Sequence, residues 1–222
     1  MPLLCRSMSI KIYNPQLAAE IAADLLKIGA IKLSPENPFT WASGWKSPIY
    51  CDNRLSLSFP EVRSKIKTAL ALAISKEFDG IDVIAGVATA GIPQGALVAE
   101  ELGLPFIYVR SKSKGHGLQN MIEGKIEKGQ KILLIEDLIS TGGSSLAAAE
   151  ALREAGAEVA GMMAIFTYGF EVSEKNFTEK DVDLVVLSDY EHLLEHAQDE
   201  MMFKNEVLKT LKEWREDPGA WG

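Results

Sequence analysis

The chain has 222 residues, a formal net charge of −8 and a hydrophobic content of 47%, which fits one large domain, or one domain with a small appendage, around a packed core. The acidic balance argues against a broad nucleic-acid interface, which requires clustered Lys and Arg, so we expect no nucleic-acid partner. No apolar run approaches the roughly 20 residues of a membrane-spanning helix, and the N-terminus lacks the apolar segment of a secretory signal, so we expect a cytoplasmic protein without membrane contact.

The first part of the chain predicts a helix followed by an irregular, aromatic-rich segment. Leu and Ile recur at helical spacing between Pro15, a suitable first-turn residue, and Gly29, a suitable stop. Residues 37–54 read NPFTWASGWKSPIYCDNR and show no regular period. A second helical pattern follows Pro60. The irregular segment therefore belongs to a small N-terminal subdomain.

From residue 81 onwards, short apolar runs alternate with helical patterns. Continuous Val, Ile and Leu runs are expected of strands that are buried on both faces, and their alternation with helices implies right-handed crossovers into a parallel sheet. This pattern predicts an α/β fold, a mainly parallel sheet flanked by helices. The strand-like runs are residues 82–89, 105–110, 131–137, 158–168 and 182–189. Residues 191–217 predict an acidic helical tail that caps the sheet or returns to the N-terminal part.

Residues 131–145, KILLIEDLISTGGSS, carry the most specific chemistry, because ligands of open parallel sheets bind beyond the carboxyl ends of strands. Glu136 and Asp137 fall at the end of a buried run, where their oxygens can accept hydrogen bonds from a sugar diol or hold hydrated Mg²⁺. The following loop offers hydroxyls and glycines before a helix that starts near Ser145: Ser140, Thr141, Gly142, Gly143 and Ser144. Converging backbone N–H groups and the helix N-terminus would bind a phosphate dianion. The alternative is an ordinary turn with solvated acids.

A second candidate loop, residues 86–95, reads GVATAGIPQG after another predicted strand. It lacks the Lys and Ser or Thr of a nucleotide-triphosphate loop. Thr89, Ala90 and Gly91 are small enough to bring backbone amides close to another anion. A purely structural turn explains this segment equally well.

The third candidate is the polar connection of residues 108–124. Four potential cations gather within seven residues: Arg110, Lys112, Lys114 and His116. Such a loop can close as a mobile lid and neutralise a polyanionic leaving group, although a solvated charged loop is the alternative. Together the three segments fit a ligand with a phosphate, a diol and a second anion, which is the pattern of 5-phosphoribosyl-1-diphosphate.

These motifs also resemble a known family. Residues 132–145, ILLIEDLISTGGSS, resemble the signature of type I phosphoribosyltransferases. Residues 37–54 together with RSKSKGHG at residues 110–117 are similar to the bacterial orotate phosphoribosyltransferases. The resemblance implies transfer of a phosphoribosyl group to orotate in pyrimidine biosynthesis, with Mg²⁺ as the cofactor. It also implies an N-terminal helix and a hood over the base site within residues 10–60, a core of residues 61–222, and a homodimer with shared active sites.

The resemblance assigns roles to individual residues. Contacts to the ribose and its 5-phosphate would come from Glu136, Asp137, Leu138, Ile139, Ser140, Thr141, Gly142, Gly143 and Ser144. The diphosphate would meet the amides of Thr89, Ala90 and Gly91 and the lid residues Arg110, Lys112, Lys114 and His116 of the partner subunit. The catalytic set would be Arg110, Lys114, His116 and Asp137, with Mg²⁺ held through the substrate near Glu136 and Asp137. Orotate would contact Ser140, Lys46 and Ser47.

The chain departs from its relatives in ways that leave alternatives open. Ser111 stands where several relatives have a second loop lysine, so Lys112 would have to take that role. The arginine that binds the orotate carboxylate in some relatives is absent near Tyr168, which leaves backbone amides, Ser140 or Lys46 for this contact.

Three readings compete with these assignments. The hood aromatics could simply fill a subdomain core, and the base could be a purine or uracil. A further alternative is a non-catalytic regulator that senses phosphoribosyl diphosphate and binds nucleic acid. The acidic net charge of the chain weighs against it.

Overall fold

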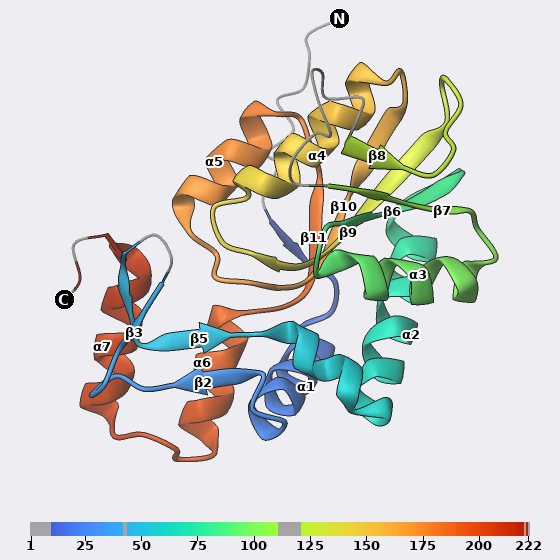
Figure 1. The fold of residues 1–222 in the computed structure, drawn as a ribbon. Coiled ribbons are helices and arrows are strands. Elements are labelled where there is room, and N and C mark those ends of the chain that lie inside the picture. The colour runs from blue at the N-terminus through green and yellow to red at the C-terminus, as the bar shows by residue number, and fades with distance from the viewer. Residues whose placement is uncertain (1–9, 42–43, 111–120, 220, 222) are drawn as a thin grey trace, which may run out of the picture.

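A mainly parallel sheet forms the centre of the molecule, which is described by a computed structural model for residues 10–41, 44–110, 121–219 and 221. Within these residues the sheet has seven strands in the order β1-β11-β10-β9-β6-β7-β8, and only β7 and β8 pair in antiparallel fashion (Figure 1). The strands are β1 (Lys11–Ile12), β6 (Val83–Val87), β7 (Phe106–Val109), β8 (Ile122–Glu123), β9 (Lys131–Ile139), β10 (Glu158–Thr167) and β11 (Leu184–Asp189). The predicted α/β fold is confirmed.

Helices cover both faces of this sheet. Leu133 and Ile135 of β9 pack into one hydrophobic cluster, whereas Ile132 and Leu134 pack into a second cluster on the opposite face. The first cluster includes residues of α1 (Pro15–Lys27), α2 (Pro60–Glu77), α3 (Gly91–Leu102), α6 (Tyr190–Asp199) and α7 (Asn205–Glu216), and the second includes residues of α4 (Gly143–Glu154) and α5 (Glu171–Glu179). The strand is therefore buried on both faces, as its continuous apolar sequence predicted.

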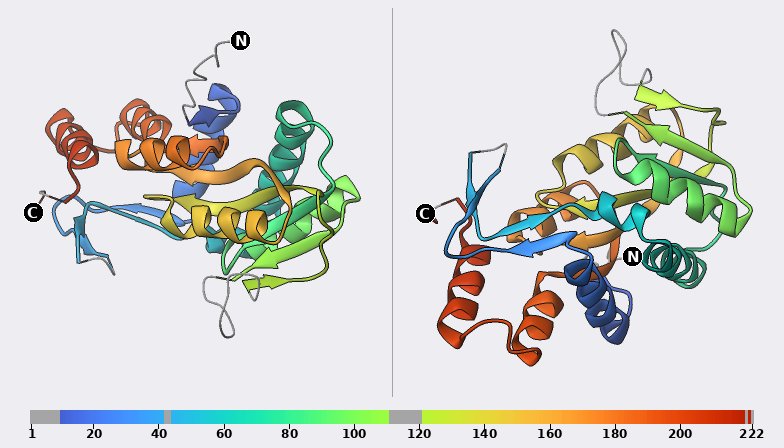
Figure 2. Two further views of the ribbon diagram at one scale, coloured as in Figure 1. Left: turned by 90° about the horizontal axis from the view of Figure 1, so that it is seen from above. Right: turned by 60° about the horizontal axis from the view of Figure 1, so that its bottom comes forward.

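Two short antiparallel pairs form the hood, which is the part of residues 10–60 that follows α1. Strand β2 (Ile31–Leu33) pairs with β5 (Ile49–Cys51), β3 (Phe39–Thr40) pairs with β4 (Lys46–Ser47), and the 3-10 helix η1 (Asn53–Ser58) leads back to the core. Both views in Figure 2 place these strands beside the C-terminal helix α7. The helical tail thus returns to the N-terminal part, one of its two predicted destinations.

Three elements differ from what the sequence suggested. Strand β1 precedes α1 but pairs with β11 at the edge of the core sheet, so the predicted N-terminal part contributes a strand to the core. Helix α5 escaped prediction because its sequence, EVSEKNFTE, is mostly polar and buries only Ser173 and Phe177. The tail divides into α6 and α7, with Met201 at positive φ in the connection between them.

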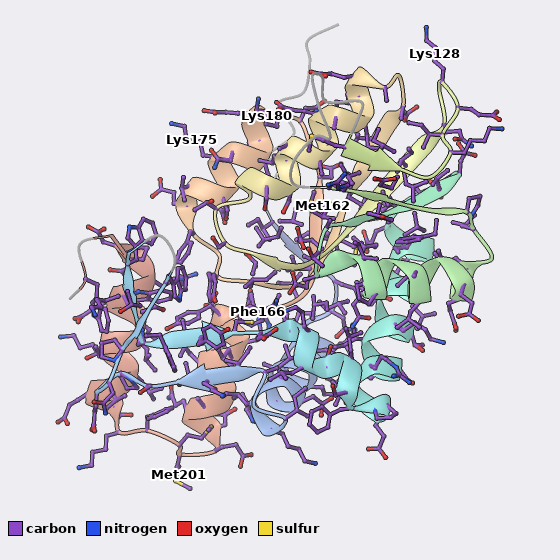
Figure 3. All side chains as sticks on the ribbon, in the orientation of Figure 1. Lys128, Met162, Phe166, Lys175, Lys180 and Met201 are labelled. Atoms are coloured by element: carbon purple, nitrogen blue, oxygen red, sulfur yellow. The ribbon has the colours of Figure 1, made fainter. Side chains whose placement is uncertain are left out.

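Side chains are sorted between core and surface as expected for a globular chain. Met162 and Phe166 of β10 have no exposed surface, whereas Met201 is 86% exposed, and Lys128, Lys175 and Lys180 extend outward (Figure 3). Among the residues that the structure describes, no helix is both long enough and apolar enough to cross a bilayer.

Candidate active site

The site is built around two adjacent carboxylates, Glu136 and Asp137, at the point where the sheet opens. Pairing of β9 with β6 ends at Ile135 opposite Gly86, but pairing with β10 continues to Ile139 opposite Thr167. The acids therefore lie inside the strand, and the expected run of residues 131–137 is extended to Ile139 by the ladder with β10. On the side where the pairing with β6 has ended, the chain that follows β6 lies against the acids at Gly91.

Glu136 is held firmly in place. Its side chain is buried, Oε2 accepts a hydrogen bond from Ser145 Oγ at 2.9 Å, and Oε1 accepts one from the Asp137 N–H at 3.0 Å. Burial raises the pKa of Glu136 well above its usual value, and the negative charge of Asp137 raises it further. Burial also raises the pKa of Asp137. Such a pair favours a shared proton or a neighbouring cation.

Asn53 connects the hood to this acid pair and was not predicted. Its side chain is almost fully buried, Nδ2 donates a hydrogen bond to the Asp137 carbonyl at 2.7 Å, and Oδ1 accepts one from Cys51 Sγ at 3.2 Å. Nothing in the local sequence signals this contact, because Asn53 and Asp137 are 84 positions apart.

The predicted phosphate loop connects β9 to α4. Helix α4 begins at Gly143, two positions before the expected start, and the loop before it is held by a hydrogen bond from Asn176 Nδ2 to the Thr141 carbonyl at 2.9 Å. Gly142 has φ +81°, and a Cβ atom there would lie 2.5 Å from Cε2 of Phe177. Glycine is therefore required by both backbone and packing. The helix N-terminus and its unpaired N–H groups point into the loop and favour an anion there.

The second loop lies beside the acid pair. Gly91 is the first residue of α3, and a Cβ atom at this position would lie 2.3 Å from the Ile135 carbonyl oxygen and 3.3 Å from Cα of Glu136. This close approach requires glycine. The predicted segment of Thr89, Ala90 and Gly91 therefore lies next to Glu136, so both can contact the same ligand.

A cavity of about 270 Å³ lies between the hood and the carboxyl end of the sheet. The hood supplies Thr40, Trp41, Tyr50 and Cys51, and the core supplies Leu138, Ser140 and Tyr168. The rings of Trp41 and Tyr168 have centroids 5.1 Å apart. An aromatic cavity next to a pair of carboxylates suits a planar ligand. Of the seven lining residues, the sequence had assigned Leu138 and Ser140 to the site.

Lys46 and Ser47, both predicted to contact orotate, lie outside this lining. Lys46 Nζ donates a hydrogen bond of 2.9 Å to Oγ1 of Thr40, so its charge is next to the cavity. The Ser47 side chain is fully buried, donating to the Ile49 carbonyl at 2.8 Å and accepting from the Ile49 N–H at 3.2 Å. The Ser47 hydroxyl is thus engaged within the hood, and the contact of Ser47 with orotate stays a prediction.

The lid residues are described only at their base. Arg110 continues β7, its N–H donates to the Met121 carbonyl at 2.8 Å, and its guanidinium lies 3.5 Å from Glu123 of β8. Lys112, Lys114 and His116 fall outside the described residues, as does Ser111. In the described ranges no group of three or more His, Cys, Asp or Glu side chains is arranged to hold a metal ion.

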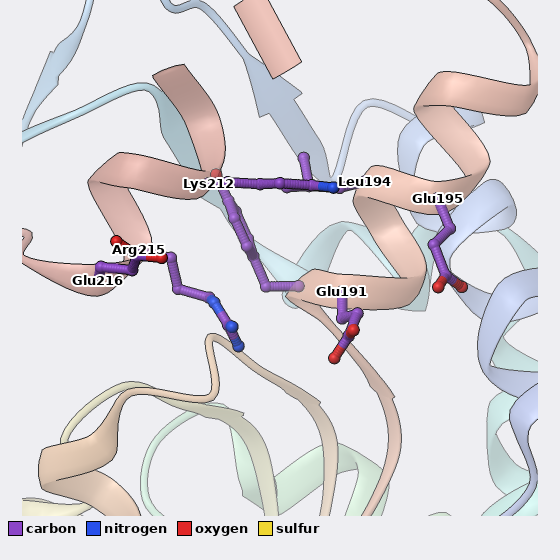
Figure 4. A pocket seen from close by; sticks show the side chains of 7 residues that line it. Glu191, Leu194, Glu195, Lys212, Arg215 and Glu216 are labelled. Atoms are coloured by element: carbon purple, nitrogen blue, oxygen red, sulfur yellow. The ribbon is translucent and has the colours of Figure 1, made fainter. Parts of the chain in front are cut away.

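A second cavity, of about 170 Å³, lies between α6 and α7 (Figure 4). Glu191 and Glu195 border it from α6, and Lys212, Arg215 and Glu216 border it from α7. None of these residues was predicted to take part in the site.

Comparison with known proteins places the chain in a family. The family described as "Phosphoribosyl transferase domain" matches residues 60–199. The orotate phosphoribosyltransferase of Cytophaga hutchinsonii is 57% identical over 202 residues, covering 91% of this chain and 97% of the relative. That of Listeria monocytogenes is 56% identical over 203 residues, covering 91% and 97%. The crystal structure of orotate phosphoribosyltransferase from Aeropyrum pernix superposes with a TM-score of 0.72 at 29% identity, covering 80% of this chain and 98% of that one. The chain belongs to the phosphoribosyltransferases and, among them, to the orotate phosphoribosyltransferase family.

Proposed function

We propose that this protein transfers the 5-phosphoribosyl group from 5-phosphoribosyl-1-diphosphate to orotate, giving orotidine 5′-phosphate and diphosphate for pyrimidine biosynthesis. The observation that carries the proposal is the junction of three features at one edge of the sheet. These are the acid pair Glu136 and Asp137, the glycine-containing loop before α4, and the aromatic cavity under the hood. They offer one candidate site each for the diol, the phosphate and the base of the expected product.

The phosphoribosyl diphosphate is proposed to lie along the carboxyl edge of β9. The carboxylates of Glu136 and Asp137 would accept hydrogen bonds from the ribose hydroxyls. The 5-phosphate would occupy the loop of residues 138–144, where the N-terminus of α4 favours negative charge. Thr89, Ala90 and Gly91 would offer amides to the diphosphate. The contact between Gly91 and Ile135 of β9 supports this assignment.

Orotate is proposed to enter the cavity that Trp41 and Tyr168 help to line. Ser140 lines both this cavity and the phosphate loop, so it can contact base and sugar phosphate together. The lining side chains themselves are uncharged, and Lys46 is the cation that contacts one of them, Thr40. We therefore assign the orotate carboxylate to Lys46, assisted by the Thr40 hydroxyl.

Mg²⁺ is proposed to accompany the diphosphate. Two adjacent carboxylates fit a hard cation that prefers oxygen ligands and keeps most of its remaining positions for water and substrate phosphates. The raised pKa values of Glu136 and Asp137 support this assignment, because a cation would relieve their repulsion. When bound, Mg²⁺ would neutralise charge on the leaving diphosphate.

The proposed reaction is a displacement at the anomeric carbon. N1 of orotate loses its proton to solvent or to the departing diphosphate and forms the new bond to C1 as the bond from C1 to the diphosphate oxygen breaks, through a transition state with oxocarbenium character. The protein positions the two reactants, and no covalent nucleophile is needed. Arg110, Lys114 and His116 of the partner subunit would stabilise the departing diphosphate in a cytoplasmic homodimer, with Lys112 nearby.

An absorbance assay tests this function directly. The purified protein with Mg²⁺ and 5-phosphoribosyl-1-diphosphate is offered orotate, uracil, xanthine and hypoxanthine in separate reactions. We expect orotate to be consumed and orotidine 5′-phosphate to form. Consumption of a purine or of uracil without orotate would replace the proposal by one of the alternative transferases, and binding without turnover of any base would favour the regulator.

A further inference from the structure

Trp214 of α7 packs behind two residues that line the cavity between the hood and the sheet. Its indole is fully buried, and Nε1 donates a hydrogen bond of 3.1 Å to the backbone carbonyl of Lys46, 168 positions away in the chain. The ring does not line the cavity, but it meets two residues that do. It packs edge-on against Trp41, with centroids 5.6 Å apart and planes at 83°, and against Tyr168, at 5.9 Å and 85°.

These contacts join the hood, the core and the C-terminal helix. Trp41 belongs to the hood, where its own Nε1 donates to the Ile49 carbonyl at 3.2 Å. Tyr168 follows β10 in the core. Helix α7 is fastened to the core independently, because the buried Tyr190 hydroxyl of α6 donates to the Leu211 carbonyl at 3.1 Å. Trp214 therefore packs against the touching rings of Trp41 and Tyr168 and holds the backbone that carries the Lys46 ammonium group.

We propose that Trp214 is a positioning residue for the base: it holds Trp41 and Tyr168, two aromatic residues of the cavity lining, and the backbone of Lys46 in place, and so determines how tightly orotate binds. This inference rests on the proposed function, since it takes orotate as the occupant of the cavity. It assigns to the C-terminal helix a role in substrate affinity although α7 supplies no residue to the cavity lining.

The test is Trp214→Phe, which keeps an aromatic ring and removes the N–H donor. We expect the KM for orotate to rise about fivefold or more, as loss of one buried hydrogen bond and looser walls would produce. The values of kcat and of KM for 5-phosphoribosyl-1-diphosphate should stay within about twofold, because the ring contacts and hydrogen bond of Trp214 involve the hood, α6 and residues 168–170 rather than the acid pair or the phosphate loop. Trp214→Tyr, which also lacks the indole N–H but has a bulkier ring, gives the same comparison if the Phe variant is poorly soluble.

Leu208→Val is the matched control. Leu208 is buried in the same helix, and the substitution removes one methylene while leaving Trp214 and its hydrogen bond to Lys46 in place. It should lower the melting temperature by an amount comparable to that of Trp214→Phe and leave the KM for orotate unchanged. An unchanged orotate KM in both Trp214 variants overturns the inference, as does an equal rise of both KM values or the same rise in Leu208→Val. Failure of the wild-type protein to use orotate would instead refute the proposed function.

Discussion

Glu136 combines a functional need with a cost to stability. A carboxyl whose pKa is higher in the folded than in the unfolded state binds its proton more readily when folded. Its contribution to the free energy of unfolding is therefore most favourable at low pH and declines as the pH rises from the unfolded toward the folded pKa. Since burial and Asp137 raise the pKa of Glu136, the charged form weakens the fold at neutral pH.

Glu136→Gln should consequently melt at a higher temperature than the wild type at pH 7 to 8 in metal-free buffer. The amide oxygen can still accept the hydrogen bond from Ser145, while the buried charge is gone. The advantage should shrink as the pH falls toward about 4, where the unfolded-state acid is also protonated. Thermal melts across this pH range check the sign, and a variant that is less stable at pH 8 than at pH 4 relative to wild type would contradict it. Turnover should fall, because a ribose contact is weakened.

Lys46→Met should remove the charge next to the cavity and keep the length of the side chain. We expect the KM for orotate to rise about tenfold or more, the range typical of a charge-assisted hydrogen bond. Lys32→Met, an exposed lysine elsewhere in the hood, is the control and should leave this KM unchanged. Steady-state kinetics with orotate compare the two variants. Equal rises of the KM in both would mean that the overall charge of the hood, and not Lys46 itself, affects orotate binding.

At the scale of elements, the sequence predicted those helices and loops whose position is determined by neighbouring residues. Helix starts at Pro15 and Pro60 and the β9, loop, α4 succession followed from capping, periodicity and glycine content. The length of β9 could not be predicted, because it depends on pairing with β10 beyond Ile135. The other five residues of the cavity lining and Asn53 were missed for the same reason, since hood and core meet through long-range packing.

The requirement for glycine in the loop before α4 can be tested by substitution. Gly142→Ala should lower stability by about 1 kcal/mol from the left-handed backbone alone, and by more because of the contact with Phe177. The KM for 5-phosphoribosyl-1-diphosphate should rise. Gly129→Ala is the matched control: Gly129 has φ +84° with no atom within 4 Å of the added Cβ, so only the backbone cost remains. Equal melting temperatures for the two variants would show that Phe177 yields freely.

At the scale of the whole molecule, the proposed sharing of sites between subunits can be tested by mixing variants. Lys114→Ala and Asp137→Asn should each be nearly inactive. After dissociation and reassembly in equal amounts, about a quarter of the wild-type activity should return, since half of the dimers are mixed and each of these has one intact site. No recovery after verified exchange of subunits would mean that the lid serves its own subunit.

The packing of α7 against the hood also has an optical consequence. The chain has four tryptophans, Trp41, Trp45, Trp214 and Trp221, and all of them lie in the hood or in the C-terminal segment. Trp41 faces Trp45 and Trp214, and Trp221 packs against the same core cluster. Indole emission therefore reports on this end of the protein alone, whereas circular dichroism reports on every helix and strand. Comparing the two signals during heating reveals whether the base-binding end and the sheet lose their structure in one step or separately.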